Sequence, residues 1–423
     1  MKKQILQLII VLCCIIAMPL AAFGTTFSVN SLDYTINDDG TNTVSVSDCV
    51  TTLTGALTIP ATVTYSNKQY TVTAIGEYAF SYCEYLTSIE IPNGVTTIGE
   101  YAFEYCIALT SIEIPSGVTT IASHMFHRCQ LLTSVEIPSG VTTIGESAFA
   151  SCPALTSIEI PAGVTTIANS TFHYCRSLTS IKIPDGVTSI GIKAFYKCEA
   201  LTSIEIPASV TEIDNSAFYG CLKSTTITFG DNSQLTTIGA YTFYNCYALT
   251  AIEIPERVTT IGGNAFCNCS KLASVTFEDN LRLTSIGIDA FAYCASLTAI
   301  EIPAGVTEIG IDAFRNCSEL ASVTVNNSTP IDINGTVFYL ISDSAVLYVP
   351  VGSKDAYSEA TVWSSFTTIE EFTPVFAGLK YSYDNENMTA TIIEYTTALE
   401  EDLRWVLIFH FLLQNLGQEP VTS

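Results

Sequence analysis

Basic residues are scarce in this 423-residue chain, which has 16 lysines and arginines against 41 aspartates and glutamates and a formal charge of −25 at pH 7. A surface so short of positive charge repels phosphate backbones and anionic lipid headgroups. We therefore expect neither nucleic acid nor an anionic membrane surface as a partner. Because hydrophobic residues still make up 48% of the chain, the sequence predicts a folded protein rather than a disordered polyanion.

Catalytic and metal-binding signatures are also missing. The sequence has no phosphate-binding glycine loop, no serine–histidine–acid arrangement and no metal-ligand motif. His124 and His127 share one turn, and His173 lies two repeats further on, about 10 Å away by strand spacing, which is too far for one metal ion. We predict no enzymatic activity, no cofactor and no metal site.

After residue 24, no segment approaches the ~20 apolar residues that a membrane span needs. Residues 1–24 begin with Lys2 and Lys3, continue with a mostly apolar run and end on Ala22-Phe23-Gly24. This order is typical of a signal peptide. We therefore expect an exported protein, extracellular or at the cell surface, cleaved near Gly24. An uncleaved anchor is the alternative, since the apolar run is long for a signal.

A fixed repeat occupies most of the remaining chain. One unit reads LTSIEIPNGVTTIGEYAFEYC, and its cysteine recurs every 23 or 25 residues, always three residues after a phenylalanine. The two longer steps come from the variants ITFGDNSQLTTIG and VTFEDNLRLTSIG, which add two residues to one turn. The phenylalanines are Phe80, Phe103, Phe126, Phe149, Phe172, Phe195, Phe218, Phe243, Phe266, Phe291 and Phe314. The cysteines are Cys83, Cys106, Cys129, Cys152, Cys175, Cys198, Cys221, Cys246, Cys269, Cys294 and Cys317.

Each unit predicts one coil of a solenoid. Leu86, Ile89 and Ile91 alternate with polar residues, which predicts a short strand with one buried face. Pro92 ends the strand, and residues 100–105 are expected to form a helical turn. About eight inward side chains per unit cannot close a core alone, so the units must stack on one another.

The LxxIxI spacing of the strand resembles the LxxLxL of leucine-rich repeats. The longer pattern IPxGVTTIGxxAFxxCxxLTSI resembles the BspA-like subclass found on surface proteins of anaerobic bacteria and some parasitic protists, over roughly residues 55–370. It departs from standard leucine-rich repeats because Pro92-Asn93-Gly94 replaces the usual asparagine after the strand. The resemblance implies an α/β repeat: a right-handed leucine-rich-repeat solenoid of short parallel β-strands with short helical or 3-10 turns. It also implies recognition or adhesion without catalytic machinery.

The sequence predicts five segments. Residues 1–24 are the signal peptide, 25–75 an N-terminal β cap, 76–340 the solenoid and 341–375 a C-terminal capping unit with a short helix over 354–364 and Trp363 covering the last rung. Residues 376–423 form an irregular tail. Its stretch FAGLKYSYDNENMTATII resembles FSVNSLDYTINDDGTNTVSV near the start, so we interpret the tail as the beginning of a truncated second cap-like segment.

The ordered cysteines have two readings. Cysteine is often a small core residue, so we expect the eleven repeated thiols to be reduced and buried. Disulfides between neighbouring rungs, about 4.8 Å apart, are the alternative. Cys49 and Cys267 are expected to be reactive at the surface, and a zinc site at Cys267 and Cys269 is a further alternative.

Charged residues recur at one exposed strand position, here called the Glu column. One reading is a stripe that binds a cation or a basic ligand, and the other is a solvated face that keeps the sheet soluble. Threonines take the same position in three units. The Glu column consists of Glu90, Glu113, Glu136, Glu159, Lys182, Glu205, Glu253 and Glu301.

Tyrosines gather in two places and form the second candidate surface. Tyrosine suits recognition because it offers a large contact area at low entropic cost. Packing between neighbouring rungs is the alternative. The candidate residues are Tyr78, Tyr82, Tyr101, Tyr105, Tyr241 and Tyr244.

Together these features predict an exported cell-surface protein that binds a protein or glycoprotein ligand, in adhesion to host or other cells. The alternatives are a structural surface protein without a specific ligand and a secreted carbohydrate-binding module. The latter has only Trp363 and Trp405 for sugar stacking.

Overall fold

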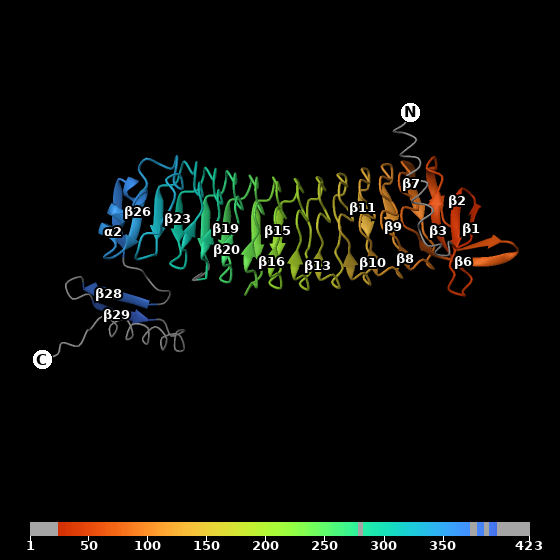
Figure 1. Cartoon of the computed structure of the whole chain (residues 1–423), viewed down its shortest axis with the longest axis horizontal. Helices are drawn as coiled ribbons and strands as arrows, with labels where there is room; N and C mark the ends of the chain where they lie inside the picture. The colour runs from red at the N-terminus through yellow and green to blue at the C-terminus, as the bar shows by residue number, and fades with distance from the viewer. Residues whose placement is uncertain (1–23, 278–281, 373–378, 385–388, 396–423) are drawn as a thin grey trace, which may run out of the picture.

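The computed structural model describes residues 24–277, 282–372, 379–384 and 389–395. Figure 1 shows one elongated stack of rungs with strands at its N-terminal end and a short helix near the other end. We name each rung by the phenylalanine of its AFxxC segment. The expected signal segment up to residue 23 and the tail from residue 396 lie outside the described residues.

The stack begins with a mixed sheet in the order β1-β2-β3-β6-β5, and β8 (Thr97–Ile98) pairs with β6. β3 and β6 are parallel, whereas β1–β2, β2–β3 and β5–β6 are antiparallel. Tyr34, Val44 and Val46 bury their side chains completely beneath this sheet. The strands are β1 Thr26–Val29, β2 Leu32–Ile36, β3 Thr43–Cys49, β5 Thr62–Tyr65 and β6 Lys68–Ile75.

Two parallel ladders then run along the stack. The first is built from the LTSIEI segment, in which Ile112 pairs with Val135 one rung later, and its buried and exposed residues alternate as the sequence predicts. In the rungs between β11 and β15 this ladder is reduced to a bridge between Glu159 and Lys182. It is also interrupted between β17 and β19 and between β21 and β23, which belong to different sheets. Its strands are β4 Thr54–Thr58, β7 Tyr85–Glu90, β9 Ser111–Glu113, β11 Ser134–Glu136, β15 Ser203–Ile206, β17 Thr226–Phe229, β19 Ala251–Ile254, β21 Ser274–Phe277, β23 Ala299–Ile302, β25 Ser322–Val325, β26 Val346–Pro350 and β27 Thr368–Phe372.

The second ladder consists of two-residue strands from the TTIG segment. One residue of each strand is a buried isoleucine. The strands that pair are in register from rung to rung, whereas β8 and β10, and β12 and β13, belong to different sheets. Its strands are β8 Thr97–Ile98, β10 Thr120–Ile121, β12 Thr143–Ile144, β13 Thr166–Ile167, β14 Ser189–Ile190, β16 Glu212–Ile213, β18 Thr237–Ile238, β20 Thr260–Ile261, β22 Ser285–Ile286 and β24 Glu308–Ile309.

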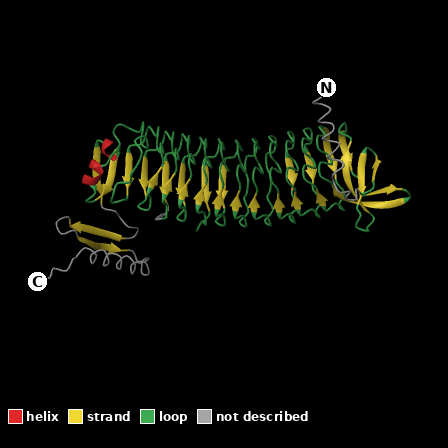
Figure 2. Ribbon diagram, in the orientation of Figure 1, coloured by secondary structure: helices red, strands yellow, loops and turns green. Residues whose placement is uncertain are grey.

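The third side of each rung is made of turns, so the expected helical turn at residues 100–105 is wrong. The backbone N–H groups of Tyr101, Phe103 and Tyr105 donate to carbonyls of the next rung instead of to carbonyls four residues earlier. Tyr101 and Tyr105 also have φ of 56° and 57°, outside the right-handed helical region. The solenoid is therefore a β-solenoid in which helix is nearly absent from the described residues (Figure 2). Its superhelical hand stays a prediction.

The core is a continuous column of phenylalanines. Neighbouring rings from Phe80 to Phe314 stack with centroids 5.0–5.6 Å apart, and each is fully buried. The column extends one rung further than the repeats suggest, because Phe338 stacks on Phe314 at 5.5 Å. Ile341 occupies the place of the cysteine in that rung.

The cysteines form a second buried column beside the phenylalanines. Ten of them, from Cys106 to Cys317, are free, and each Sγ donates to the carbonyl oxygen of the phenylalanine one rung before its own. The Sγ–O distance ranges from 3.0 Å at Cys152 to 3.6 Å at Cys221. Burial raises the pKa of the Cys175 thiol to about 12, so these thiols stay protonated at neutral pH.

Cys83, the first member of the cysteine column, is not a free thiol. Our predictions of a reduced Cys83 and a reactive Cys49 are therefore wrong. Cys83 forms a disulfide with Cys49 at the end of β3. The rung of Phe80 is the first, so no preceding phenylalanine carbonyl is present to accept a hydrogen bond from its thiol. The mixed sheet places Cys49 there instead.

The last rungs end in a compact aromatic cluster. The single helix expected at 354–364 is divided into α2 (Lys354–Glu359) and the 3-10 turn η1 (Trp363–Ser365). Trp363 is fully buried against Phe338, and its Nε1 donates to the carbonyl of Ile331 at 2.7 Å. Tyr357 is also fully buried and donates to the carbonyl of Asn327 at 3.0 Å.

The tail contains an antiparallel hairpin of β28 (Leu379–Asp384) and β29 (Thr389–Tyr395). Its register shifts between Lys380 and Tyr381, whereas the β2–β3 hairpin shifts between Asp33 and Tyr34. The tyrosines follow the irregularity in both cases, in line with the sequence resemblance of the two segments. That the tail begins a truncated second cap remains a hypothesis.

Among the helices that the structure describes, none has the length and apolar character needed to cross a bilayer.

Candidate recognition surfaces

The Glu column lies along the exposed side of the first ladder. Its members are all exposed, and the ladder brings them side by side: Glu113 pairs with Glu136, and Glu159 with Lys182. Further along, Glu205 and Glu253 pair with threonines. The column therefore forms one acidic stripe, which the single Lys182 and the threonines interrupt.

Part of this stripe is hollowed. A groove of about 640 Å³ lies over the ladder where it contains β9 and β11. Its lining consists of Ser111, Ile112, Glu113, Ser134, Val135, Glu136, Ser157, Ile158 and Glu159. Three of the eight members of the Glu column thus share one concave surface.

The predicted tyrosines divide among three columns on the turns. Tyr78 and Tyr101, two residues before their phenylalanines, stack with centroids 4.7 Å apart, and His124 continues this column at 4.5 Å. Tyr82 and Tyr105, two residues after, stack at 4.6 Å. These contacts agree with packing between rungs, yet Tyr78 and Tyr82 remain 48% and 50% exposed.

Tyr241 and Tyr244 belong to different columns, although they lie only three residues apart in the sequence. Tyr241 is exposed and belongs to the column of Tyr78, whereas Tyr244 lies one residue after its phenylalanine. There it stacks on Tyr219 at 4.8 Å, and Tyr219 stacks on Tyr196 at 4.6 Å. Burial, followed by the neighbouring Cys267, raises the pKa of the Tyr244 hydroxyl.

The backbone explains why these side chains point outward in columns. The residues two before and two after the phenylalanine have positive φ in most rungs, for example Tyr78 (58°), Tyr82 (60°) and Lys193 (56°). In this left-handed conformation a non-glycine residue costs about 1–2 kcal/mol. The inter-rung hydrogen bonds of the turns hold this backbone in place, so each rung presents two side chains at equivalent positions.

Cys267 does not lie at the surface, contrary to our expectation. It occupies the same position as Tyr244 in the next rung, is only 5% exposed, and burial raises the pKa of its thiol to about 12. Its neighbour Cys269 donates to the carbonyl of Phe243. Within the described residues, no group of three or more histidine, cysteine or acidic side chains is arranged to hold a metal ion.

The histidines pack among the turn columns. His127 Nδ1 lies 3.0 Å from Glu104 Oε1, and its ring meets that of His124 at 5.5 Å. His173 stacks on Tyr196 at 5.1 Å. Burial, with Lys193 close by, lowers the pKa of His173 to about 4, so its ring is neutral at pH 7.

Sequence reasoning missed a cluster of basic residues on the same turns. Arg128 lies over the ring of Tyr105 at 4.7 Å, Arg176 over Tyr174 at 5.1 Å, and Lys197 over Tyr174 at 5.3 Å. The signal was present in a chain with few basic residues, because Arg128 and Lys197 occupy equivalent turn positions and Arg176 lies two residues further along the turn of its own rung. It becomes visible only when the repeats are aligned in columns.

The sequence model of a protein family, the BspA type leucine rich repeat region (6 copies), matches residues 60–179, 165–284 and 284–373 of this chain. These matches extend over most of the chain, including every rung described above. The chain belongs to the BspA-type leucine-rich repeat family.

Two solved structures resemble this BspA-type chain along most of its length. A leucine-rich cell surface protein of Faecalibacterium prausnitzii A2-165 is 30% identical, covering 83% of this chain and 95% of that one with a TM-score of 0.53. A leucine-rich repeat protein of Bacteroides ovatus ATCC 8483 is 28% identical, covering 82% and 100%, with a TM-score of 0.51. No curated protein matches the sequence. The family and these relatives support a repeat-based surface or interaction protein.

Proposed function

We propose that this BspA-type chain is an exported cell-surface protein that recognises a protein or glycoprotein ligand and acts in adhesion to host or other cells. Residues 1–24 would direct export, 25–75 and 341–375 would cap a solenoid over 76–340, and no catalytic step would be involved. The basic-apolar-small order of the first 24 residues supports export. The description of the Faecalibacterium relative as a cell surface protein supports the location.

The observation that carries this proposal is the exposed tyrosine surface on the first rungs. Tyr78 and Tyr82 on the turn of the first rung, and Tyr85 at the start of β7, are 48–59% exposed. Stacking on the next rung already holds the rings of Tyr78 and Tyr82 in place. A ligand that covers them therefore gains apolar contact with little further loss of side-chain entropy.

The alternatives have less support. A purely structural protein has no need to leave several large aromatic rings half exposed at one end of the stack. A carbohydrate-binding module that stacks sugars on Trp363 is unsupported, because that indole is fully buried and hydrogen-bonded to Ile331.

Binding of the full chain to immobilised matrix proteins tests the proposal. We expect saturable binding to at least one of them, and we expect Tyr82→Ser with Tyr105→Ser to weaken it. Serine suits these positions because Ser151 has the same backbone conformation, with φ of 60°. Tyr293→Ser is the matched control, since Tyr293 is 44% exposed in the same column at the other end of the stack.

Equal loss of binding in the double variant and the control would count against a tyrosine surface on the first rungs. Absence of saturable binding across a broad panel would favour the structural alternative.

A further inference from the structure

Positive charge is concentrated on one stretch of this acidic molecule. Four of its 16 basic residues lie between residues 122 and 200 on the turns that carry the phenylalanines and cysteines, where the acidic residues are Glu146 and Glu199. Among these four, only Arg176 has an ion-pair partner in the described part of the chain, with its Nε 3.5 Å from Glu199 and both groups partly exposed. The four are Arg128, Arg176, Lys193 and Lys197.

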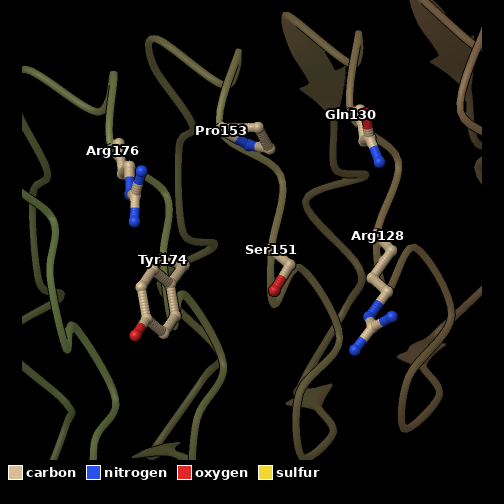
Figure 3. A pocket seen from close by; sticks show the side chains of 6 residues that line it. All are labelled: Arg128, Gln130, Ser151, Pro153, Tyr174 and Arg176. Atoms are coloured by element: carbon tan, nitrogen blue, oxygen red, sulfur yellow. The ribbon is translucent and has the colours of Figure 1, made fainter.

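A hollow of about 340 Å³ opens in the middle of this stretch. It exists because the rung of Phe149 has Ser151 and Pro153 where its neighbours have larger side chains. Arg128 and Tyr174 are the neighbours of Ser151 in its column, and Gln130 and Arg176 are those of Pro153 (Figure 3). The lining residues are Arg128, Gln130, Ser151, Pro153, Tyr174 and Arg176.

The two arginines flank this one-rung gap and belong to rungs about 10 Å apart along the stack. They stand in different columns, because Arg128 lies two residues after its phenylalanine and Arg176 four. Aromatic rings hold the guanidinium groups near them, Tyr105 under Arg128 at 4.7 Å and Tyr174 under Arg176 at 5.1 Å. Both cations are therefore positioned before a ligand arrives.

In the column of Arg128, Ser151 and Tyr174, the backbone N–H groups that line the hollow are already hydrogen-bonded. The N–H groups of Arg128, Ser151 and Tyr174 donate to carbonyls of the following rung at 2.9, 2.6 and 2.8 Å. An extended peptide therefore finds no main-chain ladder to join. Recognition must come from side chains: two guanidiniums, an amide, two hydroxyls and the apolar ring of Pro153.

We propose that the hollow between Arg128 and Arg176 binds an anionic sugar, carboxylated or sulfated, at the end of a glycan. A guanidinium forms a two-point hydrogen bond with a carboxylate or a sulfate. Gln130 and Ser151 meet the hydroxyls of the sugar, and Pro153 meets its C–H groups. This inference rests on the proposed function and names the ligand class of one site.

The net charge of −25 does not oppose this ligand. At physiological salt the Debye length is about 8 Å, so exposed glutamates several rungs away or on other faces are largely screened. A single terminal anion meets mainly the basic stretch, whereas a long polyanion would extend beyond it. The small volume of the hollow also suits one terminal sugar better than a polymer.

The test is binding of the full chain to immobilised glycans that carry a terminal carboxylated sugar, a terminal sulfated sugar or the neutral parent sugar, with an acidic peptide as a fourth arm. We expect retention on one or both charged glycans and not on the neutral parent. Arg128→Gln and Arg176→Gln should each weaken binding by about 10- to 100-fold, the usual range for a lost hydrogen bond to a charged group.

Two further variants separate the hollow from general charge and from folding. Ser151→Tyr fills the hollow without changing charge, and Tyr105 and Tyr174 already occupy equivalent positions with nearly the same φ, so we expect a folded protein that no longer binds. Lys271→Gln removes one exposed charge four rungs beyond Arg176 and should leave binding unchanged.

Unaltered binding by Ser151→Tyr, equal binding of the neutral sugar, tighter binding of the acidic peptide, or no retention on any glycan would each overturn the inference. Capture of a matrix protein by both the wild type and Ser151→Tyr would leave the proposed function standing while this site fails. If the chain binds neither a glycan nor a matrix protein, both the proposed function and this site are contradicted.

Discussion

Removing one ring from the centre of the phenylalanine column should weaken the whole stack. Phe195 is fully buried, and its ring lies 5.3 Å from that of Phe172 and 5.0 Å from that of Phe218. Phe195→Ala loses the transfer energy of the side chain and two ring contacts and leaves a cavity that its neighbours fill only in part. We expect a loss of about 4 kcal/mol in the free energy of unfolding.

The same change should also divide the unfolding of the chain in two. A rung of a solenoid contacts only its neighbours, so the halves on either side of a weakened rung become less coupled. Trp405→Phe leaves Trp363 as the only indole, because the sequence has two tryptophans. Trp363 reports on the C-terminal end alone, whereas far-ultraviolet circular dichroism reports on all rungs.

Urea unfolding followed by both signals is the assay. We expect coincident transitions before the Phe195→Ala change and separate transitions after it. Tyr293→Ser, at an exposed turn position, should change the free energy of unfolding by no more than about 0.5 kcal/mol. A loss below about 1 kcal/mol, or transitions that still coincide, would refute the idea that the phenylalanine column couples the rungs.

Three other perturbations have defined outcomes. Cys175→Ser should lower the free energy of unfolding by about 1–2 kcal/mol in urea under reducing conditions. The shorter serine side chain reaches the carbonyl of Phe149 less well than the thiol, whose Sγ lies 3.2 Å from that oxygen. An unchanged free energy of unfolding would show that the S–H···O contact is unimportant. The pKa of His173 is lowered from 6.5 to about 4 by burial, so its contribution to stability is fully present above about pH 6.5 and is lost as the pH falls towards 4. His173→Gln should therefore lose less stability than the wild type over that interval, and identical pH profiles would contradict this. Replacing Glu113 and Glu136 by glutamine should slightly raise the melting temperature while leaving ligand binding unchanged if the acidic stripe only solubilises the sheet; lost binding with intact folding would place a ligand there.

The repeat pattern predicted the parts of the fold that depend on local burial. Alternation of apolar and polar residues in LTSIEI is enough to define a strand with one buried face. When successive units stack, residues at equivalent positions, such as Phe103 and Phe126, must also stack on each other. The turn was predicted wrongly because AFxxC resembles one turn of a helix. Its hydrogen bonds run to the next rung, for example from Tyr101 to Ser123, and no local pattern encodes that.

Other features depend on how distant segments meet. The Cys49–Cys83 disulfide requires the end of β3 to lie over the first rung, which the spacing of the cysteines cannot reveal. The hollow at Ser151 arises from a small side chain between two large ones in neighbouring rungs. No single repeat contains the whole site. It forms only because side chains of three neighbouring repeats lie side by side.

The left-handed turn positions have a consequence for how such a chain can change over generations. The same backbone conformation is occupied by Tyr105, Arg128, Ser151, Tyr174 and Lys197 in five successive rungs. Exchange among these side chains leaves the buried columns untouched and should not impair folding. Selection for folding therefore does not remove substitutions at these positions, and they can accumulate. Lineages under pressure to change what they bind, or to escape what binds them, would diverge first at these positions while their phenylalanines and cysteines stay the same.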